Sequence, residues 1–300
     1  MNERYPRTIL ATALIPWDEN EEFMEGMFRS QLEHLVSSGI HHIYLFGTAG
    51  EGYAVTSGLF QRIVRIFAQA MKSPGLFPMV GVIELSVDRV NEKIDLAYDY
   101  GIRDFQVSLP AWGSLSDREI RIFLDAVIKP RPDCRFLLYN LARTKRMLDP
   151  GELARLGESY GNLAAVKHTR LTDEDATFLS TVSSPLRFFL TEKNFSRIAA
   201  SSGCGLLLSA GNLDIGMART FYQDCIRGEM TESKGFLEKM EAIIEKIKET
   251  AGEPLIDGAY DKIFTRHNLP GFPLRLKKPY VSFTELQYQI IKEYIDSVLG

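Results

Sequence analysis

Short apolar segments recur along the chain between residues 8 and 209. Short, nearly continuous apolar runs that are rich in β-branched and aromatic side chains are typical of strands buried on both faces. Eight such runs predict strands, at residues 8–15, 42–46, 78–83, 105–109, 136–140, 164–168, 187–191 and 205–209. Strands are therefore expected along most of the chain.

The residues between these runs have a different period. Apolar residues return there every three or four positions, as in helices with one buried face, and Phe28, Leu32 and Leu35 form one such stripe. The segment between Ser86 and Gly101 also has suitable ends, because serine caps helix N-termini and glycine ends helices. Helices are therefore predicted between the strands.

Strands that alternate with helices and are apolar throughout predict a parallel sheet covered by helices. Eight units favour a closed (β/α)8 TIM barrel over an open doubly wound sheet, which is the alternative. We assign the barrel's core strands and helices to residues 1–212. The last barrel helix and a helical C-terminal extension occupy residues 213–300, within one catalytic unit. This second part has no strand pattern and predicts helices at residues 213–228, 231–250 and 284–298, with a Pro/Gly-rich link at 268–275.

Composition excludes several classes of protein. The net charge is −4 without a basic stripe, which argues against a nucleic-acid partner. No apolar stretch approaches the ~18 residues of a membrane span, and the N-terminus lacks the apolar core of a secretory signal. Three scattered cysteines fit reduced thiols in a cytoplasmic protein, and five histidines without metal-binding spacing predict no metal site.

A glycine-rich loop, Gly-Thr-Ala-Gly-Glu-Gly at residues 47–52, follows the second predicted strand. Its glycines are in the wrong order for a dinucleotide fingerprint, and it lacks the lysine of a P-loop. Backbone N–H groups in such a turn suit a small anion, for example a carboxylate. The alternative is a tight turn in which Glu51 bonds to nearby backbone amides, and the residues alone do not decide between the two.

Three residues near strand ends are candidates for chemistry. Lys167 lies in an otherwise apolar strand, on the face opposite His168, and burial would lower its pKa and expose a free amine for Schiff-base formation. The alternative is a strand-end lysine that reaches solvent. Tyr139 ends the fifth strand, where it either relays protons to the lysine adduct or caps the core with its hydroxyl in water. Trp112, in the loop after the fourth strand, indicates an interface or a pocket wall.

Four motifs together resemble the dihydrodipicolinate synthase/N-acetylneuraminate lyase family of Schiff-base aldolases, over essentially the whole chain. They are GTAGEG after the second strand, YN after the fifth, VKHT on the sixth and GLLLSAGN on the eighth. The resemblance implies a (β/α)8 barrel in which Lys167 condenses with the keto group of pyruvate or another 2-oxo acid. It also implies that Tyr139 and Thr48 relay protons. No metal or organic cofactor is implied.

The resemblance further implies main-chain contacts with the substrate. Ala49 would give a backbone N–H to the substrate carboxylate, and a second main-chain contact would lie near Leu207. Members of this family form dimers, or tetramers built from dimers, so a homo-oligomer is expected.

The chain also departs from the family pattern. Ala49 stands where a second hydroxyl residue is usual, and Trp112 replaces a tyrosine that reaches the neighbouring subunit's site. The segment after the fifth strand is one residue short, and Arg143 in it either meets an acidic substrate tail or lies on the surface. Glu192 follows the seventh strand, where the lyases read the distal part of the substrate. It either binds substrate or forms a solvated pair with Lys193.

Together these features predict a Schiff-base aldolase or lyase that acts on pyruvate or a sugar-derived 2-oxo acid, making or breaking a C–C bond through an imine and an enamine. Three further functions stay open. They are a dehydratase of a deoxy keto-sugar acid, dihydrodipicolinate synthase itself, which the departures disfavour, and a regulatory protein that binds a 2-oxo acid without turnover.

Overall fold

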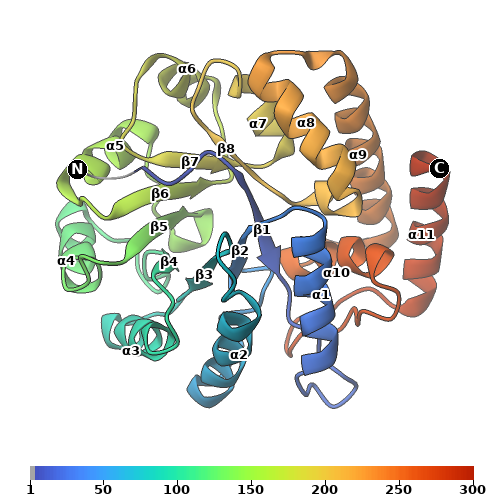
Figure 1. Cartoon of the computed structure of the whole chain (residues 1–300), viewed down its shortest axis with the longest axis horizontal. Coiled ribbons are helices and arrows are strands. Elements are labelled where there is room, and N and C mark those ends of the chain that lie inside the picture. Colours follow the sequence, from blue (N-terminus) through green and yellow to red (C-terminus); the bar gives the residue numbers. More distant parts are fainter. Residues whose placement is uncertain (1–3) are drawn as a thin grey trace.

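A computed structural model of the chain shows a closed barrel of parallel strands (Figure 1). It describes residues 4–300, with the backbone alone for residues 230–233, so the first three residues of the predicted core lie outside the described residues. The strands are β1 (Ile9–Ala13), β2 (His42–Leu45), β3 (Phe77–Gly81), β4 (Asp104–Val107), β5 (Arg135–Asn140), β6 (Leu163–His168), β7 (Arg187–Leu190) and β8 (Gly205–Leu207). Each strand pairs in parallel with the next, and β8 pairs with β1. The barrel prediction is confirmed, and the open-sheet alternative is wrong.

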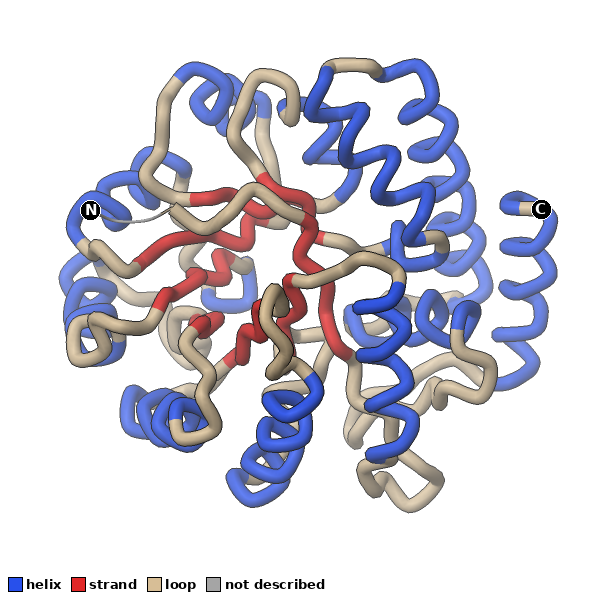
Figure 2. Tube along the Cα trace, viewed as in Figure 1, coloured by secondary structure: helices blue, strands red, loops and turns tan. Residues whose placement is uncertain are grey.

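Helices follow the strands and surround the barrel (Figure 2). They are α1 (Glu25–Ser37), α2 (Ser57–Ala70), α3 (Val87–Tyr98), α4 (Asp117–Val127), α5 (Pro150–Ser159), α6 (Asp173–Thr181), α7 (Glu192–Ile198) and α8 (Ile215–Arg227). The stripe predicted on α1 is buried against the barrel. Ser86 caps α3 by accepting a hydrogen bond from the N–H of Arg89. Gly101, just beyond α3, has a φ of 88°, a conformation that suits glycine.

The C-terminal extension contains three helices, α9 (Met230–Ala251), α10 (Asp257–Asn268) and α11 (Glu285–Leu299). Figure 1 shows α9 and α11 side by side at the edge of the molecule. The predictions for 213–228, 231–250 and 284–298 are confirmed, whereas α10 was not predicted. Its buried face carries Lys262 and Thr265 beside Ile263 and Phe264, and these polar residues interrupt the apolar pattern.

Glu51 of the glycine-rich loop fixes α10 to the barrel. Its fully buried carboxylate accepts hydrogen bonds from Lys262 Nζ at 2.9 Å, Trp17 Nε1 at 2.8 Å and the backbone N–H of Lys277 at 2.7 Å. The loop does form a tight turn, in which the Glu51 N–H donates to the Thr48 carbonyl oxygen. The Glu51 carboxylate, however, binds segments far away in the sequence, so the prediction that it bonds to nearby backbone amides is wrong. The φ of Glu51 is 55°, in the left-handed region. This contact places the N-terminal turns of α10 over one end of the barrel.

Candidate active site

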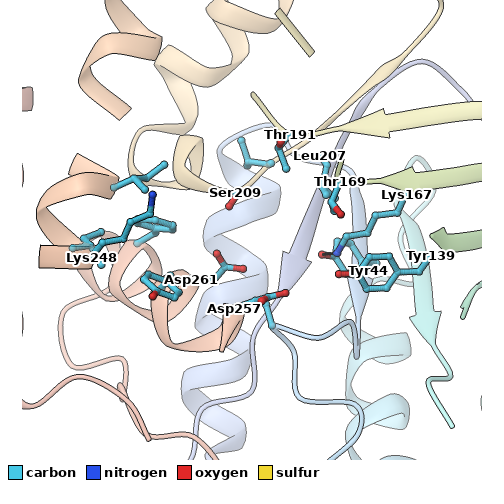
Figure 3. A pocket seen from close by; sticks show the side chains of 16 residues that line it. Tyr44, Tyr139, Lys167, Thr169, Thr191, Leu207, Ser209, Lys248, Asp257 and Asp261 are labelled. Carbon is cyan, nitrogen blue, oxygen red and sulfur yellow. Dashed lines mark hydrogen bonds between the residues drawn. The ribbon is translucent and has the colours of Figure 1, made fainter. Parts of the chain in front are cut away.

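A cavity of about 370 Å³ opens at the carboxyl ends of the strands, the usual place of active sites in this fold. The labelled residues in Figure 3 line it: Tyr44, Tyr139, Lys167, Thr169, Thr191, Leu207, Ser209, Lys248, Asp257 and Asp261. The strands supply one wall of this cavity, while α9 and α10 supply the other. The C-terminal extension therefore completes the cavity that the barrel begins.

The strand period brings Lys167 into this cavity. Lys167 is in register with Tyr139 on the neighbouring strand β5. The next residue, His168, has the opposite orientation, and its ring lies 3.1 Å from the Asn140 amide nitrogen and 3.5 Å from an Asp175 carboxylate oxygen. The predicted orientation of Lys167 is confirmed.

Two tyrosines surround the Lys167 amine (Figure 3). Its Nζ donates a hydrogen bond to the Tyr44 hydroxyl at 3.0 Å and lies 4.1 Å from the centre of the Tyr139 ring. Lys167 is only 5% exposed, so the alternative of a lysine that reaches solvent is wrong. The amine is held in a buried, aromatic environment.

Lys167 differs from the other lysines that are buried in the described part of the chain. Lys93 pairs with Glu84 at 2.8 Å, and Lys262 pairs with Glu51 at 2.9 Å. Among the side chains that the structure describes, Lys167 has no carboxylate oxygen within 4.0 Å. Lys167 is therefore the buried lysine whose amine lines the cavity and is not bound by a carboxylate.

The pKa of Lys167 departs from expectation. Burial alone would lower this pKa, but the hydroxyls of Tyr139 and Tyr44 and the carboxylate of Asp257 raise it, and the pKa ends above its ordinary value. The predicted lowered pKa is wrong, because that prediction counted burial and not the neighbours. In the free protein the amine is protonated at neutral pH, so a proton must leave before the amine can attack a carbonyl.

Two carboxyl groups face the cavity from α10. Asp257 and Asp261 are four residues apart, so they lie on the same face of the helix. Burial raises the pKa of Asp261 to about 7. Asp257 and Glu192 also raise this pKa, while Lys167 and the Ser209 hydroxyl lower it. At neutral pH the Asp261 carboxyl is therefore divided between its protonated and ionised forms.

Comparison with known proteins identifies the family. The model of the Dihydrodipicolinate synthetase family matches residues 5–296. The chain belongs to this family. The resemblance found in the sequence is confirmed, and family membership points to aldolase or lyase chemistry.

Known proteins of the dihydrodipicolinate synthetase family differ widely from this chain in sequence. A 4-hydroxy-tetrahydrodipicolinate synthase of Methanopyrus kandleri is 24% identical over 152 residues, which are 50% of each chain, so the match spans half the length of that relative. The structure of YagE from E. coli K12 in complex with pyruvate is 14% identical, with a TM-score of 0.84 over 98% of this chain and 99% of that one. Proteus mirabilis N-acetylneuraminate lyase is 16% identical, with a TM-score of 0.84 over 98% of both chains. At these identities the two structures show a common fold.

The residues that the family resemblance selected fall into two groups. Ala49 and Leu207 line the cavity with Lys167 and Tyr139, as predicted from the motifs. Thr48 is buried but lines a second cavity, of about 350 Å³. The hydroxyl that is hydrogen-bonded to the Lys167 amine belongs to Tyr44 and not to Thr48. The role of Thr48 in relaying protons stays a prediction.

Arg143 lines the second cavity and is half-exposed. Its guanidinium donates to the Asp257 carboxylate at 3.0 Å. The arginine is thus an exposed residue that is paired with Asp257, and its contact with an acidic substrate tail stays a prediction. Trp112 is 83% exposed and lies outside the residues that line the Lys167 cavity, so a role as a wall of that cavity is not found within one chain. Its role in an interface stays a prediction.

Glu192 is buried at the start of α7. Its carboxylate accepts hydrogen bonds from the backbone N–H groups of Ser209, at 2.7 Å, and Gly211, at 3.0 Å. Lys193 pairs instead with Glu241 at 2.7 Å, so the interpretation of Glu192 and Lys193 as a solvated pair is wrong. Glu192 shapes the cavity by holding the loop that presents Ser209, and its direct contact with substrate stays a prediction.

Sequence reasoning did not find Tyr44, Asp257 or Asp261. Tyr44 was counted as one apolar residue of a strand. The two aspartates had only their spacing of four residues as a signal, in a helix that was itself missed. Neither signal says which distant residues these side chains would meet.

Among the described residues, no helix is both long and apolar enough to cross a membrane. No group of three or more His, Cys, Asp and Glu side chains among them is arranged to hold a metal ion.

Proposed function

We propose that this protein is a Schiff-base aldolase or lyase that acts on pyruvate or a sugar-derived 2-oxo acid. The observation that carries the proposal is Lys167, a buried amine between two tyrosines that has no carboxylate partner among the described residues. A cytoplasmic location is part of the proposal, supported by the buried Cys134 and Cys204, which form no disulfide.

The proposed reaction begins when Lys167 loses a proton and its Nζ attacks the keto carbon of the 2-oxo acid. The resulting carbinolamine takes up a proton on its hydroxyl and loses water, which gives a protonated imine. Backbone N–H groups near Ala49 hold the substrate carboxylate, and Tyr139 moves protons to and from the adduct.

The C–C bond changes in the next step. In cleavage, the C4 hydroxyl loses its proton, and the electrons of the C3–C4 bond move toward the imine nitrogen. An aldehyde leaves and an enamine stays on Lys167. In synthesis, the enamine attacks an aldehyde carbon, and the aldehyde oxygen gains the proton. Water then releases the product from the lysine. The pyruvate bound in the YagE structure supports pyruvate as the first substrate to test.

Borohydride trapping tests this proposal. Incubation with pyruvate and borohydride is expected to add one reduced pyruvyl group, and peptide mapping is expected to place it on Lys167. The buried Lys93 and Lys262 serve as internal controls, because their amines are bound by Glu84 and Glu51 and line neither of the two cavities. A Lys167→Ala variant is expected to give no adduct. An adduct on another lysine, or none in the wild type, would contradict the mechanism.

A dehydratase is the second candidate, and Asp261 favours it. A carboxyl group with a pKa of about 7 is partly protonated at neutral pH and is able to protonate a leaving hydroxyl. Product analysis separates the two reactions, since an aldolase releases pyruvate from a deoxy keto-sugar acid and a dehydratase consumes the acid without releasing pyruvate.

Dihydrodipicolinate synthase activity and binding without turnover have less support. In dihydrodipicolinate synthase an arginine in this loop meets an acidic tail, whereas Arg143 is paired here with Asp257. A binding protein without turnover would not need a buried amine that is hydrogen-bonded to a tyrosine hydroxyl, as Lys167 is to Tyr44.

A further inference from the structure

The charged groups that line the cavity beyond Lys167 differ in whether they have an ion-pair partner (Figure 3). Asp257 is paired with Arg143 at 3.0 Å. Lys248, which lines the cavity from α9, pairs with Glu245 at 2.7 Å and is more than half exposed. Within residues 4–300, Asp261 has no cation within 4.0 Å, although it lines the same cavity as Lys167. It is the carboxyl group left available to a substrate.

We propose that Asp261 determines substrate specificity by accepting hydrogen bonds from hydroxyl groups on the substrate chain beyond its 2-oxo acid group. The substrate class is then a polyhydroxylated 2-oxo acid rather than one with an acidic tail. This inference rests on the proposed function, because the 2-oxo acid group must first be fixed at Lys167.

The chemistry of the facing groups supports this choice. The groups that face Asp261 are Lys167 on β6, Asp257 on its own helix, Glu192 on α7 and Ser209 after β8. After imine formation at Lys167, an acidic tail would add a negative charge beside carboxylates whose repulsion already raises the pKa of Asp261. Hydroxyl groups add no charge, and they both donate to a carboxylate and accept from a carboxylic acid.

Three six-carbon probes separate the contribution of the tail. They are 2-oxohexanoate, 2-oxo-4,5,6-trihydroxyhexanoate and 2-oxoadipate, which share the 2-oxo acid end and differ in having a plain, hydroxylated or acidic tail. Borohydride trapping at Lys167 reports occupancy without requiring turnover, and intact and pyruvyl adducts are counted together. The concentration for half-maximal trapping is measured for each probe and for pyruvate.

For the wild type we expect the hydroxylated probe to trap at the lowest concentration. In Asp261→Asn that concentration is expected to rise about tenfold to a hundredfold, as for loss of a hydrogen bond to a charged group. The values for pyruvate and 2-oxohexanoate are expected to stay within about twofold, and 2-oxoadipate is expected to trap more readily. Asp261→Glu retains a carboxylate and should keep part of the preference. Asp88→Asn, an exposed aspartate in the first turn of α3, is the matched control.

The outcomes distinguish this inference from the proposed function. Suppose that pyruvate is trapped at Lys167 but Asp261→Asn changes the half-maximal trapping concentration of every probe by the same factor, or that the wild type traps 2-oxoadipate at the lowest concentration. Either result makes the inference wrong and leaves the proposed function standing. If pyruvate gives no adduct at Lys167, the proposed function fails and the inference falls with it. Circular dichroism of each variant checks that the fold is retained.

Discussion

The Tyr44 hydroxyl accepts a hydrogen bond from the amine on which the proposed chemistry depends. This bond stabilises the ammonium form of Lys167 and so contributes to its raised pKa. Tyr139 contributes to the same effect and contacts the amine through its ring. In the free site the Lys167 amine is therefore protonated. It must lose a proton before it can attack the carbonyl group of a substrate.

Tyr44→Phe tests this role of the tyrosine. Removing the hydroxyl removes a contribution that raises the pKa of Lys167, so the neutral amine becomes more abundant at a given pH. The rate of pyruvate trapping at pH 7 is expected to rise several-fold, and the pH–rate profile should move to lower pH. Tyr53→Phe is the control, because Tyr53 lines the second cavity. An unchanged profile in Tyr44→Phe would argue against the hydrogen bond.

Asp261 is expected to reduce stability at neutral pH. Its pKa rises from 3.8 to about 7 on folding, so the unfolded chain ionises more readily, and this lowers the free energy of unfolding as pH rises from about 4 to about 7. Above pH 7 both states are ionised, and the effect is constant. A shift of this size corresponds to roughly 4 kcal/mol at most.

Asp261→Asn mimics the protonated carboxyl and should remove this penalty. The variant is expected to unfold at a higher temperature than the wild type at pH 8, by several degrees, and at nearly the same temperature at pH 4. Thermal unfolding at both pH values measures this. A variant less stable than the wild type at pH 8 would mean that ionised Asp261 is stabilised by its surroundings.

At the scale of elements, α10 supplies part of the cavity wall that faces the strands. Its attachment depends on the buried pair Glu51–Lys262, which joins the glycine-rich loop to the C-terminal extension. Breaking one partner leaves the other charge buried without compensation.

Glu51→Gln is therefore expected to lower the free energy of unfolding by about 3–5 kcal/mol. Adding Lys262→Met removes the unpaired charge and should restore part of the loss. Denaturant unfolding of both single variants and the double variant gives the coupling energy. If the effects of the two substitutions simply add, the pair does not hold α10 in place.

Gly258 marks a close approach between α10 and the loop that is proposed to bind the carboxylate. A Cβ added there would lie 2.9 Å from the Ala49 carbonyl oxygen, which belongs to the backbone. Gly258→Ala is expected to push the two segments apart and to raise the pyruvate concentration for half-maximal trapping about tenfold. Gly26→Ala is the control, since no atom lies within 4 Å of its added Cβ. If both variants need the same pyruvate concentration for half-maximal trapping, the contact between α10 and the loop does not contribute to pyruvate binding.

At the scale of the whole molecule, Trp112 is the residue at which we expect a second copy of the chain to pack. Its side chain is 83% exposed, and tryptophan is enriched in the cores of protein–protein interfaces. The family resemblance implies a homo-oligomer, so another copy of this chain is the expected partner.

Light scattering at micromolar concentration is expected to give two or four times the chain mass of 33.9 kDa. Trp112→Ser should weaken the dimer at least tenfold, corresponding to about 1.4 kcal/mol or more, if the ring is buried between copies. Exposed Ile122→Ser, on α4, is the comparison. A wild type that is monomeric, or an assembly that does not respond to Trp112→Ser, would contradict this role.

The sequence by itself determined the repeating architecture and the position of Lys167 within it. Strand and helix periods depend on neighbouring residues in the chain, so eight units and their order followed from local pattern. Alternation along a strand likewise fixed the face of Lys167. The motifs also selected Tyr139, Ala49 and Leu207, which the structure brings to the same cavity.

Only the tertiary structure decided the environment of that lysine. The buried Glu51–Lys262 pair places α10 over the barrel, and with it come Asp257 and Asp261. The direction of the pKa shift of Lys167 and the specificity inferred for Asp261 depend on charges that are distant in sequence and adjacent in space. Electrostatic interactions depend on distance and burial, and no local sequence pattern contains either quantity.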